Sequence, residues 1–152
     1  QVAGRAGRER RQGEVIVQTA FATHPFWHRL LTGGYADVAE FSLAEREAAA
    51  WPPFSRLALI RASAVQRQHT HQFLEAARKR AEKLGADNVR LLGPVSAPME
   101  RRAGRYRAQL LLQSGSRQAL HELLNRLVAA LETLPAARRV RWSVDVDPIE
   151  LF

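Results

Sequence analysis

The sequence predicts an α+β domain with a four-stranded antiparallel sheet and two helices on one face of it. Two stretches, 105–113 and 140–147, alternate apolar and polar residues, as strands with one buried face do. Two others, 68–84 and 116–134, repeat apolar residues at helical spacing. With two further strands the elements follow the order β-α-β-β-α-β, which is the ferredoxin-like arrangement.

The first fifty residues are predicted to hold separate elements. Residues 1–8 can form a short helix, and the β-branched residues of 14–19 predict a strand. A helix is expected from Pro25 to a stop at Gly33-Gly34, and a second helix follows over 35–50. The prolines in Trp51-Pro52-Pro53-Phe54 interrupt this helix, so the sequence predicts a domain boundary between residues 50 and 51.

Six elements are predicted for the domain over residues 51–152. They are a strand at 57–64, a helix at 68–84 that ends at Gly85, a short strand at 89–92 that ends at Gly93-Pro94, a strand at 105–113, a helix from a Ser116 cap to Pro135, and a strand at 140–147. The apolar strand faces should pack under the two helices. The opposite sheet face should then expose polar side chains, namely Arg105, Arg107, Gln109, Gln113, Arg141 and Ser143.

The charge of the chain narrows the class of partner. The formal net charge is +8, and lysine occurs only at Lys79 and Lys83, so arginine supplies most of the positive charge. Because the guanidinium group suits phosphates and base edges, a polyanion is expected, nucleic acid rather than a membrane. A GC-rich coding sequence would explain the scarcity of lysine but not the net charge. No apolar run reaches the roughly 20 residues of a membrane span.

The chain begins with Gln-Val-Ala-Gly-Arg-Ala-Gly-Arg. On a helix, Arg5 and Arg8 share one face, and paired guanidiniums suit the charge on a transferring phosphoryl group. The pattern Q-x-x-G-R-x-G-R resembles motif six of superfamily-two helicases. That resemblance implies that Gln1 and Arg5 lie near the nucleotide and that Arg8 is the arginine finger. The alternative is a basic helix start without nucleotide contact.

Later segments carry a closer resemblance. GPVSAPMERRAGRYRAQLLLQS at 93–114 and VRWSVDVDPIELF at 140–152 are similar to the C-terminal domain of the PriA helicase family, primosomal replication protein N-prime. GEVIVQT and the WPPF junction match as well, although Trp51 stands where the family has leucine or a similar residue. The resemblance implies that residues 1–50 are the C-terminal remnant of helicase lobe two, with motif six and linking helices, and that 51–152 are the ferredoxin-like domain.

The family implies a function for the parent protein. It would be an ATP-dependent 3′→5′ DNA helicase, an ATP hydrolase, of replication restart and primosome assembly in the bacterial cytoplasm, associated with the nucleoid. Its partners would be forked and single-stranded DNA, single-strand-binding protein and the other primosome proteins. The parent would use ATP and Mg, with zinc in an upstream cysteine-rich insert. This sequence has no cysteine and no G-x-x-x-x-G-K-[ST] loop, so the chain alone is expected to hold no cofactor and to be inactive.

An arginine-rich turn between the second and third strands is the candidate for DNA binding. It contains Arg101, Arg102, Arg105 and Arg107. Such side chains contact phosphates and position the protein without reading sequence. The alternative is that they dock the domain on the helicase lobes. Tyr106 alternates onto the apolar face and is expected in the core.

Arg117, at the start of the last helix, is the candidate for a protein partner. The resemblance aligns it with the arginine that binds the acidic C-terminal tail of single-strand-binding protein, and His121 one turn later is a weaker candidate. A solvated helix start is the alternative. No metal site is predicted, because the histidines lack ligand spacing and Asp145 and Asp147 are expected to form salt bridges with Arg105, Arg107 or Arg141.

Two function classes stay open from the sequence. The chain is either a non-catalytic part of a DNA helicase that binds branched or single-stranded DNA and the tail of single-strand-binding protein, or a purely structural domain that braces the helicase lobe. A base-stacking RNA-recognition module is disfavoured, because no aromatic residue is predicted on the open sheet face.

Overall fold

The computed structural model describes residues 14–149 of the chain. The chain divides into two compact units, Gln1–Leu43 and Ala44–Phe152, and each is described by itself. The division falls within a helix, and the domain boundary after residue 50 stays a prediction. The helix expected over residues 1–8 lies outside the described residues.

Two helices are described in the first third of the chain, α1 (Pro25–Thr32) and α2 (Gly34–Ala48). The His24 ring caps α1 by accepting a hydrogen bond from the amide of Phe26 at 3.3 Å. Gly34 begins α2 rather than helping to end α1. The prediction of a strand at 14–19 was wrong. No described segment pairs with the backbone there, and a strand needs such a partner to satisfy its amide and carbonyl groups.

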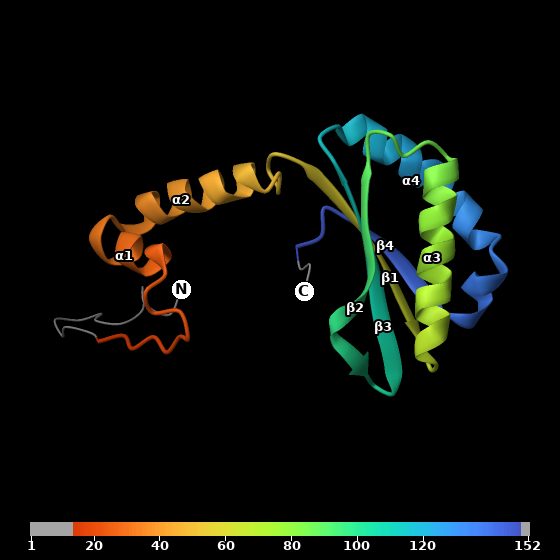
Figure 1. Ribbon diagram of the computed structural model, residues 1–152, viewed down its shortest axis with the longest axis horizontal. Helices are drawn as coiled ribbons and strands as arrows, with labels where there is room; N and C mark the ends of the chain where they lie inside the picture. Colours follow the sequence, from red (N-terminus) through yellow and green to blue (C-terminus); the bar gives the residue numbers. More distant parts are fainter. Residues whose placement is uncertain (1–13, 150–152) are drawn as a thin grey trace, which may run out of the picture. The chain divides into compact units, whose positions relative to one another are not determined.

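The second unit has the predicted β-α-β-β-α-β order. Its elements are β1 (Arg56–Ala64), α3 (Arg67–Lys83), β2 (Arg90–Arg102), β3 (Arg105–Ser114), α4 (Arg117–Glu132), a 3₁₀ helix η2 (Pro135–Arg139) and β4 (Arg141–Val146). The strands form one antiparallel sheet in the order β2-β3-β1-β4. Helices α3 and α4 lie on the same side of this sheet, as Figure 1 shows. The predicted ferredoxin-like fold is confirmed.

The core lies between the sheet and the two helices. Alternate residues of β1 and β3, such as Ile60 and Leu110, are fully buried there, as are Phe73 on α3 and Leu127 on α4. Trp142 of β4 packs on Phe73, with ring centroids 5.7 Å apart. The predicted Ser116 cap of α4 is confirmed, because the Ser116 hydroxyl accepts a hydrogen bond from the amide of Ala119 at 3.2 Å.

Strand β2 is longer than the predicted 89–92, because the chain continues through Gly93-Pro94 as far as Arg102. Gly93 adopts φ +105°, a conformation that only glycine takes readily, and the pairing with β3 shifts there. It shifts again beyond Ser96, which pairs with Ala108, whereas Arg101 pairs with Tyr106. Residues 97–100, which we name the β2 bulge, therefore lie opposite Arg107 alone.

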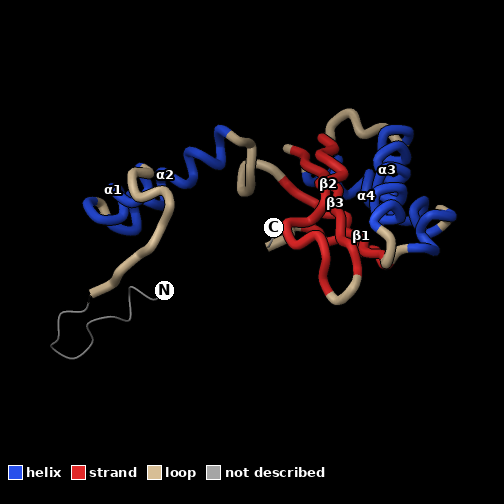
Figure 2. Tube along the Cα trace, turned by 60° about the horizontal axis from the view of Figure 1, so that its bottom comes forward, coloured by secondary structure: helices blue, strands red, loops and turns tan. Residues whose placement is uncertain are grey.

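A two-residue turn joins β2 to β3. Arg102 and Arg105 pair across it, and Ala103 and Gly104 both have positive φ, at 49° and 74°. This is the conformation of a type I′ hairpin turn, whose twist suits the flanking strands. In Figure 2 the hairpin is visible as two red strands that meet at a tan turn at the bottom of the view. The predicted role of Gly104 in bending the chain is confirmed.

The sheet face away from the helices differs from its prediction at one end. Gln113 was expected to be exposed but is 5% exposed, because its side-chain amide donates to the carbonyl of Ala50 at 2.6 Å and lies 3.4 Å from the Ser55 hydroxyl. Leu57 and Leu59 also lie on this face, and both are buried. Polar exposure is therefore confined to the half of the face that holds Arg61, Arg107 and Arg141.

Candidate nucleic-acid interface

The exposed half of the open sheet face is a basic depression. Two adjoining hollows, of about 300 Å³ and 1080 Å³, share Arg61, Ala97, Arg107 and Gln109 in their lining. The smaller hollow also contacts Arg141, and the larger one Arg102. We name this depression the arginine trough, after Arg61, Arg102, Arg107 and Arg141.

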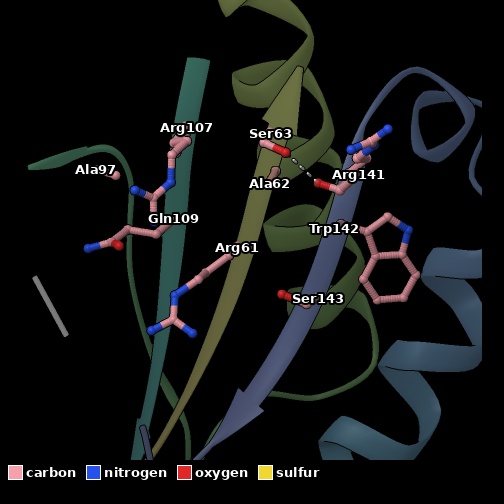
Figure 3. A pocket seen from close by; sticks show the side chains of 10 residues that line it. Arg61, Ala62, Ser63, Ala97, Arg107, Gln109, Arg141, Trp142 and Ser143 are labelled. Carbon is pink, nitrogen blue, oxygen red and sulfur yellow. Dashed lines mark hydrogen bonds between the residues drawn. The ribbon is translucent and has the colours of Figure 1, made fainter. Parts of the chain in front are cut away.

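Strand register brings the arginines of the trough together. Ser63 of β1 lies between Arg107 of β3 and Arg141 of β4, since it pairs with both. Arg61 lies two residues along β1 and therefore on the same face, about 7 Å from that row. Neighbouring strands are separated by about 4.8 Å, so three guanidiniums from three strands can reach one ligand. Figure 3 shows Arg61 and Arg107 on this face, whereas the Trp142 indole points to the helix side.

The charges of the trough are only partly compensated. Arg61 Nη1 donates to Asp145 Oδ2 at 2.5 Å, with both side chains partly exposed. Within the part of the chain that the structure describes, no hydrogen bond or ion pair holds the guanidinium of Arg102, Arg107 or Arg141. Asp145 and Asp147 are the acids of the trough lining. Four arginines against two carboxylates leave a net positive surface that attracts phosphate.

The arginines predicted for DNA binding divide into two pairs. Arg102 and Arg107 line the trough. Arg105 instead donates from Nη2 to the backbone carbonyl of Ser63 at 3.1 Å, and its buried Nε has no hydrogen-bond partner among the described residues. The Arg101 guanidinium lies 5.4 Å from the ring centroid of the half-buried Tyr106. Arg101 and Arg105 are thus engaged within the domain.

One residue of the trough was not predicted from the sequence, and the ion-pair partner of another was predicted wrongly. Arg61 was not singled out, although strand alternation puts it on the open face with Ser63. Asp145 was expected to pair with Arg105, Arg107 or Arg141, which was wrong, since it pairs with Arg61 on the adjacent strand. The reason is register: Leu59 lies opposite Asp145, so the neighbouring open-face residue Arg61 is in reach.

The β2 bulge forms one wall of the trough through Ala97, Pro98 and Met99. Glu100 ties this wall to the first turn of α3, because its carboxylate lies 2.6 Å from Arg67 Nε and accepts from the Ser96 hydroxyl at 2.9 Å. The wall is therefore held from outside, with an apolar surface toward the arginines.

The remaining candidates lie elsewhere. Arg117 and His121 are exposed, one turn apart on α4. Gln1, Arg5 and Arg8 lie outside the described residues. No three histidine or acidic side chains gather into a metal-holding group anywhere in residues 14–149. None of the helices described is long and apolar enough to cross a membrane.

The fold and this face define a ferredoxin-like α+β domain with a basic open sheet. The chain belongs to the family described as the primosomal protein N C-terminal domain, whose model matches residues 47–149. The resemblance stated from the sequence is thereby confirmed.

Curated relatives are similar along almost the whole chain. The replication restart protein PriA of Haemophilus influenzae is 39% identical over 99% of this chain and 20% of its own length. The PriA proteins of Synechocystis and Bacillus subtilis are 32% and 30% identical over 99% and 97% of this chain, and 18% of their own lengths. The chain thus spans about a fifth of the length of these relatives.

Proposed function

We propose that this chain is the C-terminal part of an ATP-dependent 3′→5′ DNA helicase of replication restart, and that its ferredoxin-like domain binds branched or single-stranded DNA. Membership of the family and the name of the relatives, replication restart protein PriA, support the first part. The arginine trough supports the second part, which is DNA binding by the ferredoxin-like domain. ATP, Mg and zinc would belong to the parent protein, with Arg8 as the arginine finger and Gln1 and Arg5 beside the nucleotide.

The observation that carries DNA binding is the set of uncompensated guanidiniums on one open face. Arg102, Arg107 and Arg141 come from three strands and share a depression without a described ion pair. A strand of phosphates neutralises such a set, and counterion release makes this binding favourable and salt-dependent. No base-specific contact is required, as suits a protein that acts at forks of any sequence.

A second surface is proposed for single-strand-binding protein. Arg117 and His121 are exposed on one face of α4, and an arginine there suits an acidic peptide. Since α4 covers the opposite side of the sheet from the trough, both ligands can bind together. The other primosome proteins are proposed partners of the parent.

The test is fluorescence anisotropy with a labelled fork and a labelled single strand, at low and moderate salt. The double variant Arg107→Gln/Arg141→Gln should weaken binding to both and reduce the salt dependence, by roughly 0.7 to 0.9 in slope for each lost phosphate contact. The charge-matched control is Lys79→Gln/Arg80→Gln, which removes two exposed positive charges from α3 in the helical layer.

Two results would refute trough binding. One is equal weakening by the trough variant and by Lys79→Gln/Arg80→Gln, which would make the attraction a property of net charge alone. The other is no binding at moderate salt to either DNA. The domain would then be the structural brace of the helicase lobe.

A further inference from the structure

The trough is not uniformly basic. Its floor carries Arg61 and Arg107, whereas the wall formed by the β2 bulge presents Pro98 and Met99. Met99 is 60% exposed although it is large and apolar. Duplex DNA shows phosphates on its outside and keeps its bases stacked within, so an apolar wall beside the arginines has no partner on a duplex backbone. An unpaired nucleotide offers both surfaces at once, a phosphate and the flat face of a base.

We infer that the β2 bulge is a base-contacting wall, which makes the trough selective for unpaired DNA strands. The phosphodiester lies on Arg107 and Arg141, and a base rests against Pro98 and Met99. This inference deepens the proposed function and rests on it, because it names the form of DNA that the trough accepts and the residues that recognise it.

The shape and support of the wall agree with this role. The bulge places residues 97–100 opposite the single residue Arg107, so the apolar side chains stand next to the guanidinium that would hold the phosphate. Arg67 and Ser96 hold Glu100 from the helix side, which keeps its carboxylate bonded away from an incoming phosphate. The larger hollow, about 1080 Å³, has room for more than one nucleotide.

Acidic groups set the orientation of the strand. Asp145 and Asp147 line the larger hollow together with the arginines. Carboxylates repel phosphates but accept hydrogen bonds from the exocyclic amino groups of bases. Phosphates are therefore expected near Arg107 and Arg141, with base edges directed toward the two aspartates.

The test compares two labelled single strands of equal length, one with normal bases and one in which the bases of alternate nucleotides are removed. Both carry the same phosphates, so the electrostatic part of binding is the same. The full chain is expected to bind the normal strand about fivefold more tightly, since burying part of a base on an apolar wall contributes roughly as much as one or two methylene groups. Replacing Met99 by alanine should reduce that ratio toward one and leave the affinity for the abasic strand unchanged.

Val65→Ala is the matched control, because Val65 is an apolar side chain that is 68% exposed and lies outside the trough. Equal affinity of the normal protein for the two strands overturns the inference, and so does a Met99→Ala effect that is the same for both. In either case binding that still depends on Arg107 and Arg141 leaves the proposed function standing. Loss of that dependence overturns the proposed function and the inference together.

Discussion

Arg61 and Asp145 form an ion pair across the adjacent strands β1 and β4, with Nη1 and Oδ2 2.5 Å apart, on the floor of the arginine trough. The side chains are 32% and 41% exposed, so water screens the pair and its contribution to stability is small. Its importance is electrostatic: Asp145 occupies part of the surface that would otherwise face a phosphate. The carboxylate thus keeps phosphates away from this part of the trough.

Asp145→Asn is expected to tighten DNA binding about two- to fivefold, because it removes a repulsive charge worth roughly 0.5–1 kcal/mol in an exposed setting. Anisotropy titration at several salt concentrations measures the affinity and its salt slope, and the slope should become steeper. Glu75→Gln, an exposed acid on α3, is the charge-matched control. If the affinity for DNA rises equally in both variants, the trough has no specific role in binding.

Arg117→Ala is expected to weaken binding of the acidic C-terminal tail peptide of single-strand-binding protein about two- to fivefold, as loss of one exposed charge pair would. Calorimetric titration with the peptide measures this. The comparison variant is Arg126→Ala, about two and a half turns along α4, where the Nε donates to the carbonyl of Glu122. DNA binding should be unaffected in either variant. An unchanged affinity of Arg117→Ala for the peptide would contradict the proposed binding of single-strand-binding protein.

Ala103→Asn is expected to stabilise the β2–β3 hairpin. Ala103 adopts φ 49°, a left-handed conformation that costs an alanine roughly 1 kcal/mol and that asparagine tolerates. Asn-Gly is also the preferred pair of a type I′ turn. The free energy of unfolding, from urea denaturation, should rise by about 0.5–1 kcal/mol, whereas Gly104→Ala at φ 74° should lower it by a similar amount. A fall in both variants would contradict the turn geometry.

Gly93→Ala is expected to destabilise the domain and to disturb the trough wall. At φ +105°, an added Cβ would lie 3.0 Å from the amide nitrogen of Val95 and 3.1 Å from the carbonyl oxygen of Gln109, both backbone atoms. The cost is of the order of 1–3 kcal/mol, measured by urea unfolding. Gly115→Ala is the control, because nothing lies within 4 Å of its added Cβ. Equal stability of the two variants would mean that the strand relaxes freely at Gly93.

Most of the architecture follows from local patterns. The strand β3 and the helices α3 and α4 were predicted because their apolar residues repeat with the period of each element, and most of those residues are buried. The wrong prediction of a strand at 14–19 shows the limit of this reasoning. β-branched residues favour an extended chain, but a strand exists only where another segment completes its hydrogen bonds.

The functional face was predicted less well. Arg107 and Arg141 were expected on the open face, and both line the trough. Arg101 and Arg105 look equivalent to them in sequence, yet their guanidiniums are taken up by Tyr106 and by the carbonyl of Ser63. Arg61 was missed because one arginine within an apolar strand carries no motif.

From the sequence we could predict the order of the elements in the second unit, the side of each that is buried, the turn at Gly104 and the family, because these depend on residues close together in the chain. Only the folded sheet brings Arg61 to Asp145, 84 residues away, buries Gln113 and makes β2 bulge opposite Arg107. Each of these depends on the register between strands that are distant in sequence. A shift of one residue would move every side chain to the other face, so the trough exists only once the sheet is assembled.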